Sequence, residues 1–392
     1  MLQNFRLVIA GALASGLLGG AGAQAAAPVT DCPAAKEPYS SDTMLLDLNL
    51  DPRAKAVLGR DFPQLARLPF AVMFEKADPP SFGAILSPAK ISEMTPPGAF
   101  DRLKLDKDLG AIPLTNEAIV RRCARYDEER PPLPRDLPHP AILVFEKING
   151  FRDEGSVSAA HEALSAMAKR RGWRLIFTER AGVFNSEDLS RFDAVVWNNV
   201  SGDVLTLPER ESLKTWIGSG GGFAAFHGSA GDPVYMWDWY VDRLIGARFL
   251  GHPMGPQFQE AVVRVEDGSP GVTKGLPASW AMTEEWYSFA KSPRGPGVHI
   301  LARLDETSYS PIGMGGTNLR MGDHPIAWTQ CIGDGRSFYS AIGHRPQSYS
   351  EPNSLRLLEA GISWAAGEGD TRCKAGVEQP RRDSQDRAVG PR

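Results

Sequence analysis

The feature that most constrains the fold is an alternation of apolar runs and helical patterns between Ala141 and Gly228. "AILVFEK" is apolar nearly throughout, as expected of a strand that is buried on both faces. "SVSAAHEALSAMAKRRG" follows with apolar residues at helical spacing, and Gly172 ends it. The next runs are "WRLIFTE", "FDAVVWNN", the helical "PERESLKTWIGSGG" and "GFAAFHG". This order predicts an α/β fold: a doubly wound, mostly parallel sheet with helices on both faces.

The second half of the chain has a different pattern. "QFQEAVVRVED", "WAMTEEWYSF" and "VHILARLDET" look like strands, and no long helix separates them. "PIAWTQCI" and "RSFYSAIG" flank Gly333-Asp334-Gly335, which predicts a hairpin. We therefore expect added antiparallel strands in this half, closed by a helix over "EPNSLRLLEAGISWAAG".

The chain begins with the features of a secretory signal peptide, which we assign to residues 1–25. "MLQNFR" carries one positive charge, and the apolar "LVIAGALASGLLGG" is too short and glycine-rich to span a membrane. Ala23-Gln24-Ala25 provides a cleavage site; the alternative is an uncleaved N-terminal anchor. We predict a periplasmic or secreted protein that has no membrane span after cleavage.

Three further segments are expected. Residues 26–138 form an N-terminal extension with short helices over "DPRAKAVLGRDFPQLARL" and "TNEAIVRRCARY", ending in the proline-rich linker "PPLPRDLPHP". Residues 139–368 form the α/β domain. Residues 369–392 are polar without an apolar period, which predicts a disordered tail.

Export would place the four cysteines in an oxidising compartment. Four cysteines allow three disulfide pairings, and their spacing does not resemble a zinc site. Of the three pairings we prefer Cys32–Cys123 with Cys331–Cys373, because it ties both chain ends to nearby sequence.

Composition excludes several function classes. The net charge is −4, and basic residues do not form a block, so nucleic acid is not an expected partner. "GSGGGF" precedes a strand, whereas the dinucleotide-binding motif follows one. We therefore expect no nicotinamide cofactor, and nothing in the sequence indicates a flavin.

The stretch "GGGFAAFHGSAGD" ends its strand on His227. Ligands of parallel α/β sheets bind beyond the carboxyl ends of the strands. Ala225 and Ser229 provide small neighbours for a sharp turn with His227 at its apex, whereas a Ser229 apex would put bulky His227 at a small position. The alternative is a strand-end histidine that hydrogen-bonds a neighbouring loop.

Several motifs occur in a characteristic order: "GGGFAAFHGSAGD", "MWDWYVDRLIGARFLGHP", "EEWYSF", "VHILARLDETSY", "HPIAW" and "GRSFYSAIGH". Together they resemble the ThuA-like (trehalose utilisation-like) family over about residues 141–367. The resemblance implies a class I glutamine amidotransferase-like, flavodoxin-like fold. In those enzymes the turn carries a cysteine, but His227 stands at that place here, so amidotransferase chemistry is not expected. The sequence also departs from the family at Asp153, where a histidine is common, and at Glu284.

The candidate catalytic residues are His227, Glu285 and His252. Glu284 and Glu285 are adjacent on a strand, so they point to opposite faces, and the family motif favours Glu285 as acid or base. The alternative is an ordinary surface carboxylate. The resemblance places His252 and His344 near His227. These three histidines could hold a divalent metal, although the sequence has no close pair such as H-x-x-x-H.

Aromatic and polar residues near the strand ends suit a sugar, whose C–H faces stack on aromatic rings while its hydroxyls form hydrogen bonds. The alternative is that the aromatic side chains fill the core, and Arg152 could instead pair with Asp153 or Glu154. The predicted substrate-binding residues are Lys147, Phe151, Arg152, Asn199, Trp237, Tyr287 and His344.

These observations favour an exported enzyme that acts on a carbohydrate or an oxidised (keto) sugar. The reaction would be hydrolysis or isomerisation using His227 and Glu285, and the partner would be a small-molecule carbohydrate. The alternative is a non-catalytic carbohydrate-binding or scaffolding module with the same fold. The sequence does not indicate an oligomeric state.

Overall fold

The computed structural model describes residues 27–68, 71–93, 95, 98, 100–266, 271–369 and 373. The predicted signal peptide and nearly all of the predicted tail lie outside these residues. Within the described part of the chain, no helix has the length and apolar character needed to cross a membrane.

A nine-stranded sheet forms the centre of the molecule, in the order β2-β1-β3-β4-β11-β10-β9-β6-β7. The first five strands in this order run parallel, and the remaining pairings are antiparallel. The α/β fold with antiparallel strands added in the second half is therefore confirmed. The strands are β1 (Ala141–Phe145), β2 (Arg174–Thr178), β3 (Ala194–Trp197), β4 (Gly222–Phe226), β6 (Phe258–Val265), β7 (Ser279–Glu285), β9 (Val298–Leu304), β10 (Pro325–Ile332) and β11 (Gly335–Ser340).

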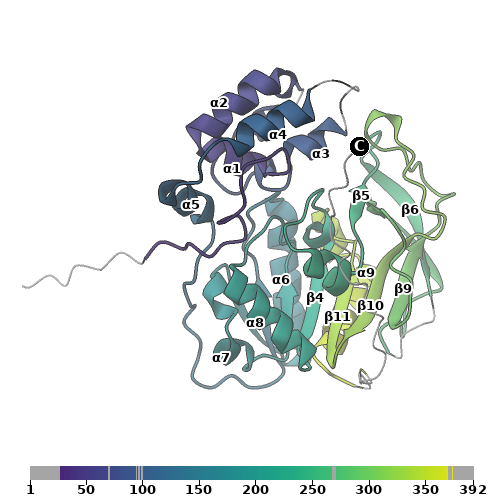
Figure 1. Cartoon of the computed structure of the whole chain (residues 1–392). Coiled ribbons are helices and arrows are strands. Elements are labelled where there is room, and N and C mark those ends of the chain that lie inside the picture. Colours follow the sequence, from purple (N-terminus) through teal and green to yellow (C-terminus); the bar gives the residue numbers. More distant parts are fainter. Residues whose placement is uncertain are drawn as a thin grey trace, which may run out of the picture.

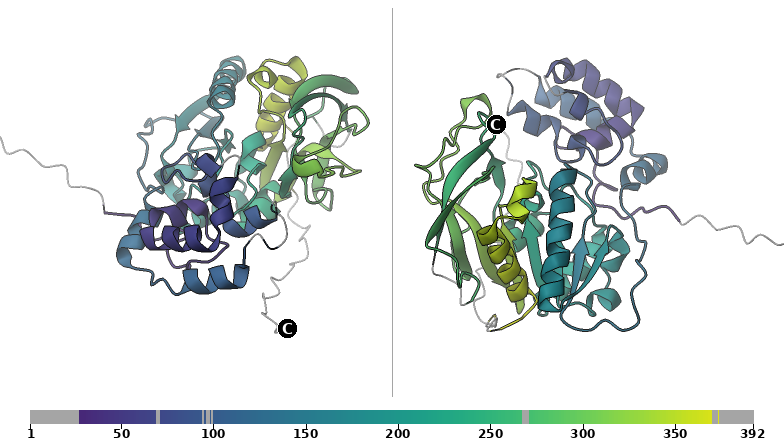
Figure 2. Two further views of the ribbon diagram at one scale, coloured as in Figure 1. Left: turned by 90° about the horizontal axis from the view of Figure 1, so that it is seen from above. Right: turned by 180° about the vertical axis from the view of Figure 1, so that it is seen from behind.

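Helices cover both faces of the parallel half. α8 (Leu207–Gly218) and the short α7 (Ser186–Leu189) lie on the face toward the viewer in Figure 1, and α6 (Glu154–Arg171) and α9 (Pro352–Ala365) lie on the other face, which Figure 2 shows from behind. Because both faces are covered, every residue of β1, β3 and β4 is buried. This explains why their sequences are continuous apolar runs.

Local signals set the ends of α6. The Asp153 side chain accepts a hydrogen bond of 2.9 Å from the backbone N–H of Ser156, which caps the helix at its start. Gly172 ends it with a φ of +76°, a conformation that favours glycine. Asp153 is thereby fixed at the carboxyl edge of the sheet, just after β1.

The predicted hairpin is present, and its second strand has a further partner. β10 and β11 pair antiparallel, while β11 also pairs in parallel with β4 from Arg336↔Gly222 to Ser340↔Phe226. The hairpin thus joins the parallel and antiparallel halves. As a result, the segment after β11 lies at the same edge as the segment after β4.

One strand prediction was wrong in extent. The run "WAMTEEWYSF" is not a single strand: β7 ends at Glu285, and β8 (Ser288–Phe289) pairs with β5 (Phe249–Gly251) in a separate two-stranded sheet. Trp286 is fully buried and donates from its indole to the carbonyl of Gln259 over 2.8 Å. Burial of this side chain at the end of β7 accompanies the break in the ladder.

The N-terminal helices form an apolar cluster of their own, which includes Leu45, Leu58 and Leu105. Figures 1 and 2 show these helices packed against one end of the sheet region. The helices here are α1 (Leu45–Leu50), α2 (Pro52–Asp61), α3 (Pro88–Ser92), α4 (Arg102–Gly110) and α5 (Asn116–Cys123).

The domain boundaries at residues 138 and 368 stay predictions. The short 3₁₀ segments are Pro63–Arg67, Ala71–Met73, Phe82–Ala84, Ala181–Val183, His227–Ala230, Met314–Gly316 and Pro346–Tyr349, and Tyr240–Ile245 is a π-helix.

Both preferred disulfides are confirmed. Cys32 pairs with Cys123 and Cys331 pairs with Cys373, which accounts for all four cysteines of the chain. Because disulfides persist in oxidising compartments, they suggest an extracellular or periplasmic location.

Candidate functional site

His227 follows β4 directly and turns the chain into the 3₁₀ segment His227–Ala230. Its φ is +30°, which is uncommon for a residue other than glycine. The hydroxyl of Tyr339 donates to the His227 carbonyl over 3.0 Å, so β11 holds this turn in place. Gly343 passes so close that an added Cβ would lie 3.2 Å from the Cβ of His227. The side chain of His227 is only 3% exposed.

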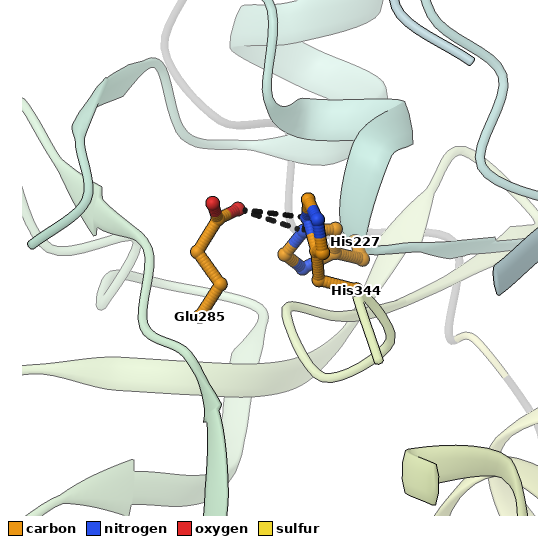
Figure 3. Close-up of side chains that lie close together, drawn as sticks. All are labelled: His227, Glu285 and His344. Carbon is orange, nitrogen blue, oxygen red and sulfur yellow. Dashed lines mark hydrogen bonds and ion pairs between the residues drawn. The ribbon is translucent and has the colours of Figure 1, made fainter. Parts of the chain in front are cut away.

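Three side chains converge at this edge (Figure 3). Nε2 of His227 lies 3.1 Å from Oε2 of Glu285 and 3.1 Å from Nδ1 of His344. Nδ1 of His344 is also 3.1 Å from the same Oε2, so the three atoms form an equilateral triangle. Glu285 is 2% exposed and His344 is 9% exposed. We call these three side chains the His-Glu-His triangle.

The other ring nitrogens and the other carboxylate oxygen have their own partners. Nδ1 of His227 lies 2.7 Å from the carbonyl oxygen of Ala341. A carbonyl can only accept, so this Nδ1 carries a proton, and Nε2 presents its lone pair when the ring is neutral. Nε2 of His344 lies 3.3 Å from Oδ2 of Asp153. Gln257 donates from Nε2 to Oε1 of Glu285.

Electrostatics favour a carboxylate at the centre of this group. Burial raises the pKa of Glu285, but hydrogen bonds from His227 and His344 and the charges of His227 and His252 outweigh it and hold that pKa well below its usual range. Burial lowers the pKa of His344, whereas the hydrogen bond and negative charge of Glu285 raise it more, so the net shift is upward. The group therefore pairs an anionic carboxylate with the imidazole of His344, whose protonated form it stabilises.

His252 lies beside the triangle rather than in it. Its Nδ1 is 3.0 Å from the carbonyl of Pro253 and 3.4 Å from Oε1 of Glu285, and its side chain is 24% exposed. Among the described residues, the histidine, cysteine and acidic side chains whose donor atoms converge within 4.8 Å are His227, Glu285 and His344. The geometry thus joins Glu285, rather than His252, to the other two predicted histidines.

Two predicted substrate-binding residues support the turn that carries His227. The ring of Tyr287 lies 4.0 Å from the ring of His227, and burial raises the Tyr287 pKa well above its usual value. Asn199 accepts a hydrogen bond of 3.2 Å from the N–H of Gly228 and donates to the hydroxyl of Tyr349 over 2.9 Å. Both residues are buried.

The remaining predicted substrate-binding residues are spread more widely. Phe151 is near the triangle, with its ring 5.9 Å from that of His344. Lys147 pairs with Asp127 of the N-terminal region. Arg152 pairs with Glu154 over 2.7 Å, the surface alternative that the sequence left open, and also with Glu179. Trp237 lies beside Trp239, with ring centroids 5.3 Å apart and the ring planes tilted by 31°, and it lies under the guanidinium of Arg210.

Sequence reasoning did not include Glu284 in the site. Its carboxylate is fully buried and accepts hydrogen bonds from the N–H of Glu285 over 2.8 Å, from the N–H of Gly343 over 3.1 Å and from the hydroxyl of Ser348. It therefore fixes the loop that carries His344. Alternation along the strand predicts that Glu284 and Glu285 point to opposite faces of the sheet. It does not predict that the loop that carries His344 packs against Glu284.

Asp153 and Gln257 were also not included in the predicted site. Asp153 stood out as a departure from the family pattern, and it faces His344 while it caps α6. Gln257 immediately precedes β6, whose first residue Phe258 is paired with Glu285, so its proximity follows from strand register. Alternation fixes the face that each strand residue takes, but the residues that lie opposite one another also depend on the connection between the two strands.

Among the similar solved structures, one supports the fold. A ThuA-like protein from Bacteroides uniformis is 24% identical, with 60% of this chain and 95% of that chain covered and a TM-score of 0.51. A ThuA-like protein from Parabacteroides merdae is 18% identical over 59% of this chain and 92% of that chain, with a TM-score of 0.41. A search of curated proteins found no significant match.

The comparison with protein families gives the decisive match. The ThuA family, described as trehalose utilisation, matches residues 141–365, which is more than half of the chain and covers β1 through α9. The protein therefore belongs to the ThuA trehalose utilisation family.

Proposed function

We propose that this is an exported enzyme that acts on a carbohydrate or an oxidised (keto) sugar at the His-Glu-His triangle, by hydrolysis or isomerisation. The family description, trehalose utilisation, supports a sugar as the substrate class. The two disulfides support export.

The observation that carries the proposal is the contact of one buried carboxylate with two imidazoles, each at 3.1 Å. Groups that can exchange protons at hydrogen-bond distance are what general acid–base catalysis requires. Glu285 and His227 would move a proton to or from a sugar hydroxyl, or from a carbon next to a carbonyl. The exposed edges of His252 and Phe258, and the proximity of Phe151, offer a sugar both polar and apolar contacts.

The alternative is a carbohydrate-binding module without turnover. Its support is the 2% exposure of His227 together with the engagement of both ring nitrogens. A ring held in this way can stabilise the fold of the edge without touching a substrate.

The test uses the mature, disulfide-intact protein and a panel of disaccharides, glycosides and their keto derivatives, with binding and turnover measured separately. We expect turnover by the wild type, and we expect His227→Ala to reduce it by about 10²-fold or more while binding persists. The matched control is His299→Ala, because His299 is exposed on β9 and is not one of the side chains that converge in the triangle. Binding of a sugar without turnover of any panel member would favour the module instead.

A further inference from the structure

We propose that His227, Glu285 and His344 together bind one divalent transition-metal ion, with Zn²⁺ as the first ion to test. This inference rests on the proposed function and deepens it: with an ion bound, His227 and Glu285 would be ligands instead of proton carriers, and the ion would activate a water or polarise a sugar oxygen. Metal binding can be measured without any sugar, so the two proposals can fail separately.

The first argument is distance. Nε2 of His227, Oε2 of Glu285 and Nδ1 of His344 are mutually 3.1 Å apart. A point about 2.1 Å from all three atoms, the usual Zn–N and Zn–O distance, lies about 1 Å out of their plane. Ligands of a tetrahedral ion are about 3.4 Å apart at this bond length, so the triangle needs only a small expansion. This spacing is also an ordinary hydrogen-bond distance, so the direction of the lone pairs decides between an ion and a proton.

The second argument is the direction of the lone pairs. The carbonyl of Ala341 fixes the proton of His227 on Nδ1, and the carboxylate of Asp153 faces Nε2 of His344. Both outer partners favour the tautomer whose free lone pair points into the triangle. Metal-binding histidines characteristically donate their other N–H to a carbonyl or carboxylate in this way. The same contacts make the facing lone pairs repel one another unless a cation lies between them.

A single proton is the competing cation. One proton on His344 can satisfy its contact with Glu285, but it leaves Nε2 of His227 facing that carboxylate with a lone pair. A second proton on that Nε2 would satisfy this contact too, but it would bring the N–H groups of two imidazolium rings to 3.1 Å from each other. A divalent ion satisfies all three atoms at once. Two imidazoles and one carboxylate form a donor set that binds zinc in hydrolases and iron(II) in oxygenases, and it leaves coordination positions open for water or a substrate oxygen.

The number of metal ions bound per protein is easy to interpret, because free thiolates do not contribute to it. All four cysteines are in disulfides, so thiolate does not compete for the ion.

The mature protein is stripped with a chelator, and Zn²⁺ and Co²⁺ are titrated by calorimetry, with metal content measured after dialysis. We expect one equivalent to be retained, and we expect Co²⁺ to give the visible absorption of a low-coordinate site.

The variants assign the site. Glu285→Gln and His344→Ala should each lower the affinity by at least about 100-fold, whereas the exposed His299→Ala should bind like the wild type. Asp153→Asn is the subtler variant, because asparagine still caps α6 while it removes the charge that faces His344. It should lower the affinity by roughly 10–100-fold without loss of folding.

Retention of less than a tenth of an equivalent by the wild type would overturn the inference, as would wild-type affinity in Glu285→Gln. If Glu285→Gln or His344→Ala fails to fold, anomalous diffraction from Zn²⁺-soaked wild-type crystals is the deciding measurement. A peak within the triangle supports the site, and its absence overturns the inference. Sugar turnover by the stripped protein would leave the proposed function standing without the metal. Metal binding by a protein that turns over no sugar would support the metal site and contradict the proposed enzymatic function.

Discussion

At the scale of single residues, the site depends on a carboxylate that does not belong to the triangle. Glu284 receives three hydrogen bonds, from Glu285, Gly343 and Ser348, while it is fully buried. Glutamine at this position retains one acceptor oxygen and brings a donor group against other donors. Leaving a buried polar group unpaired costs about 1–3 kcal/mol.

We therefore expect Glu284→Gln to lower the free energy of unfolding by about 1–3 kcal/mol in denaturant titrations. The matched control is Glu162→Gln, since Glu162 is exposed on α6 and should change the stability by less than about 0.5 kcal/mol. Equal stability of the two variants would show that the contacts of Glu284 are not the ones described.

Asp232 should make stability depend on pH. Its carboxylate accepts hydrogen bonds from Ser201 over 2.6 Å and from the N–H of Gly202 over 2.7 Å. Burial nevertheless dominates and raises its pKa to about 7, above the value of about 4 expected in the unfolded chain. Between these values the folded protein holds a proton that the unfolded chain has released. The contribution of Asp232 to stability is therefore full below pH 4 and is lost as the pH rises toward 7.

The expected slope from this group is at most about 1.4 kcal/mol per pH unit. Asp232→Asn cannot release the proton, so the variant should gain stability relative to the wild type as the pH rises from 4 to 7. Denaturant titrations of both proteins across this range provide the measurement. Two curves that stay parallel would contradict the raised pKa.

At the scale of elements, the N-terminal helices meet the sheet region at the loop after β1. Ser81 donates from its backbone N–H to the carbonyl of Asn149 over 3.0 Å, and Phe82 lies with its ring 5.1 Å from that of Phe151. Phe151 in turn lies beside His344. The N-terminal region therefore contacts the loop that borders the triangle. We expect a change at this junction to alter the position of that loop beside the triangle.

Gly150 tests this junction. A Cβ at this position would lie 2.4 Å from Oγ of Ser201, 2.6 Å from a methyl group of Ile85 and 2.8 Å from the backbone nitrogen of Gly202. We expect Gly150→Ala to lower the free energy of unfolding by about 1–3 kcal/mol through overpacking. Gly59→Ala is the matched control: Gly59 lies within α2 with nothing near its added Cβ, so alanine should stabilise by about 0.5–1 kcal/mol. Opposite signs for the two changes would confirm the close approach, and equal signs would contradict it.

The elements differ in how well the sequence predicts them, for physical reasons. β1, β3 and β4 are buried on both faces and α6 has clear caps, so apolar runs and helix signals identify them. The helix α4 has few apolar residues and many charged ones, so its sequence pattern is weak. The break between β7 and β8 coincides with the tertiary packing of Trp286, which the local sequence pattern does not contain. The parallel pairing of β11 with β4 is likewise a tertiary choice that the hairpin motif does not contain.

The same distinction applies to the site. His227 is predictable because a local motif ends its strand, and Glu285 because it belongs to a recognised motif and alternates with Glu284. Lys147, Arg152 and Trp237 follow the same edge in sequence, yet their partners are Asp127, Glu154 and other aromatic rings. A strand end gives the approximate place of a side chain. The direction in which a long side chain points is set by partners far away in the sequence.

At the scale of the whole molecule, the two disulfides secure opposite ends of the described chain. Cys32–Cys123 joins residues 91 apart, and both sulfurs are buried next to Ala34 and Tyr126. Cys331–Cys373 joins β10 to the segment beyond α9, with a separation of 42 residues. Cross-links of this length restrict the unfolded chain, and each native disulfide is worth about 2–5 kcal/mol.

Replacement of each pair by serine should separate their contributions. We expect Cys32→Ser with Cys123→Ser to cost more than Cys331→Ser with Cys373→Ser, because the first pair closes the longer loop and its removal leaves two hydroxyls in a buried cluster. Denaturant titrations under oxidising conditions give both free energies. Because the two pairs lie in different parts of the fold, the four-serine protein should lose about the sum of the two costs, and the reduced wild type should lose nearly as much. A reduced protein as stable as the oxidised one would mean that neither cross-link stabilises the fold.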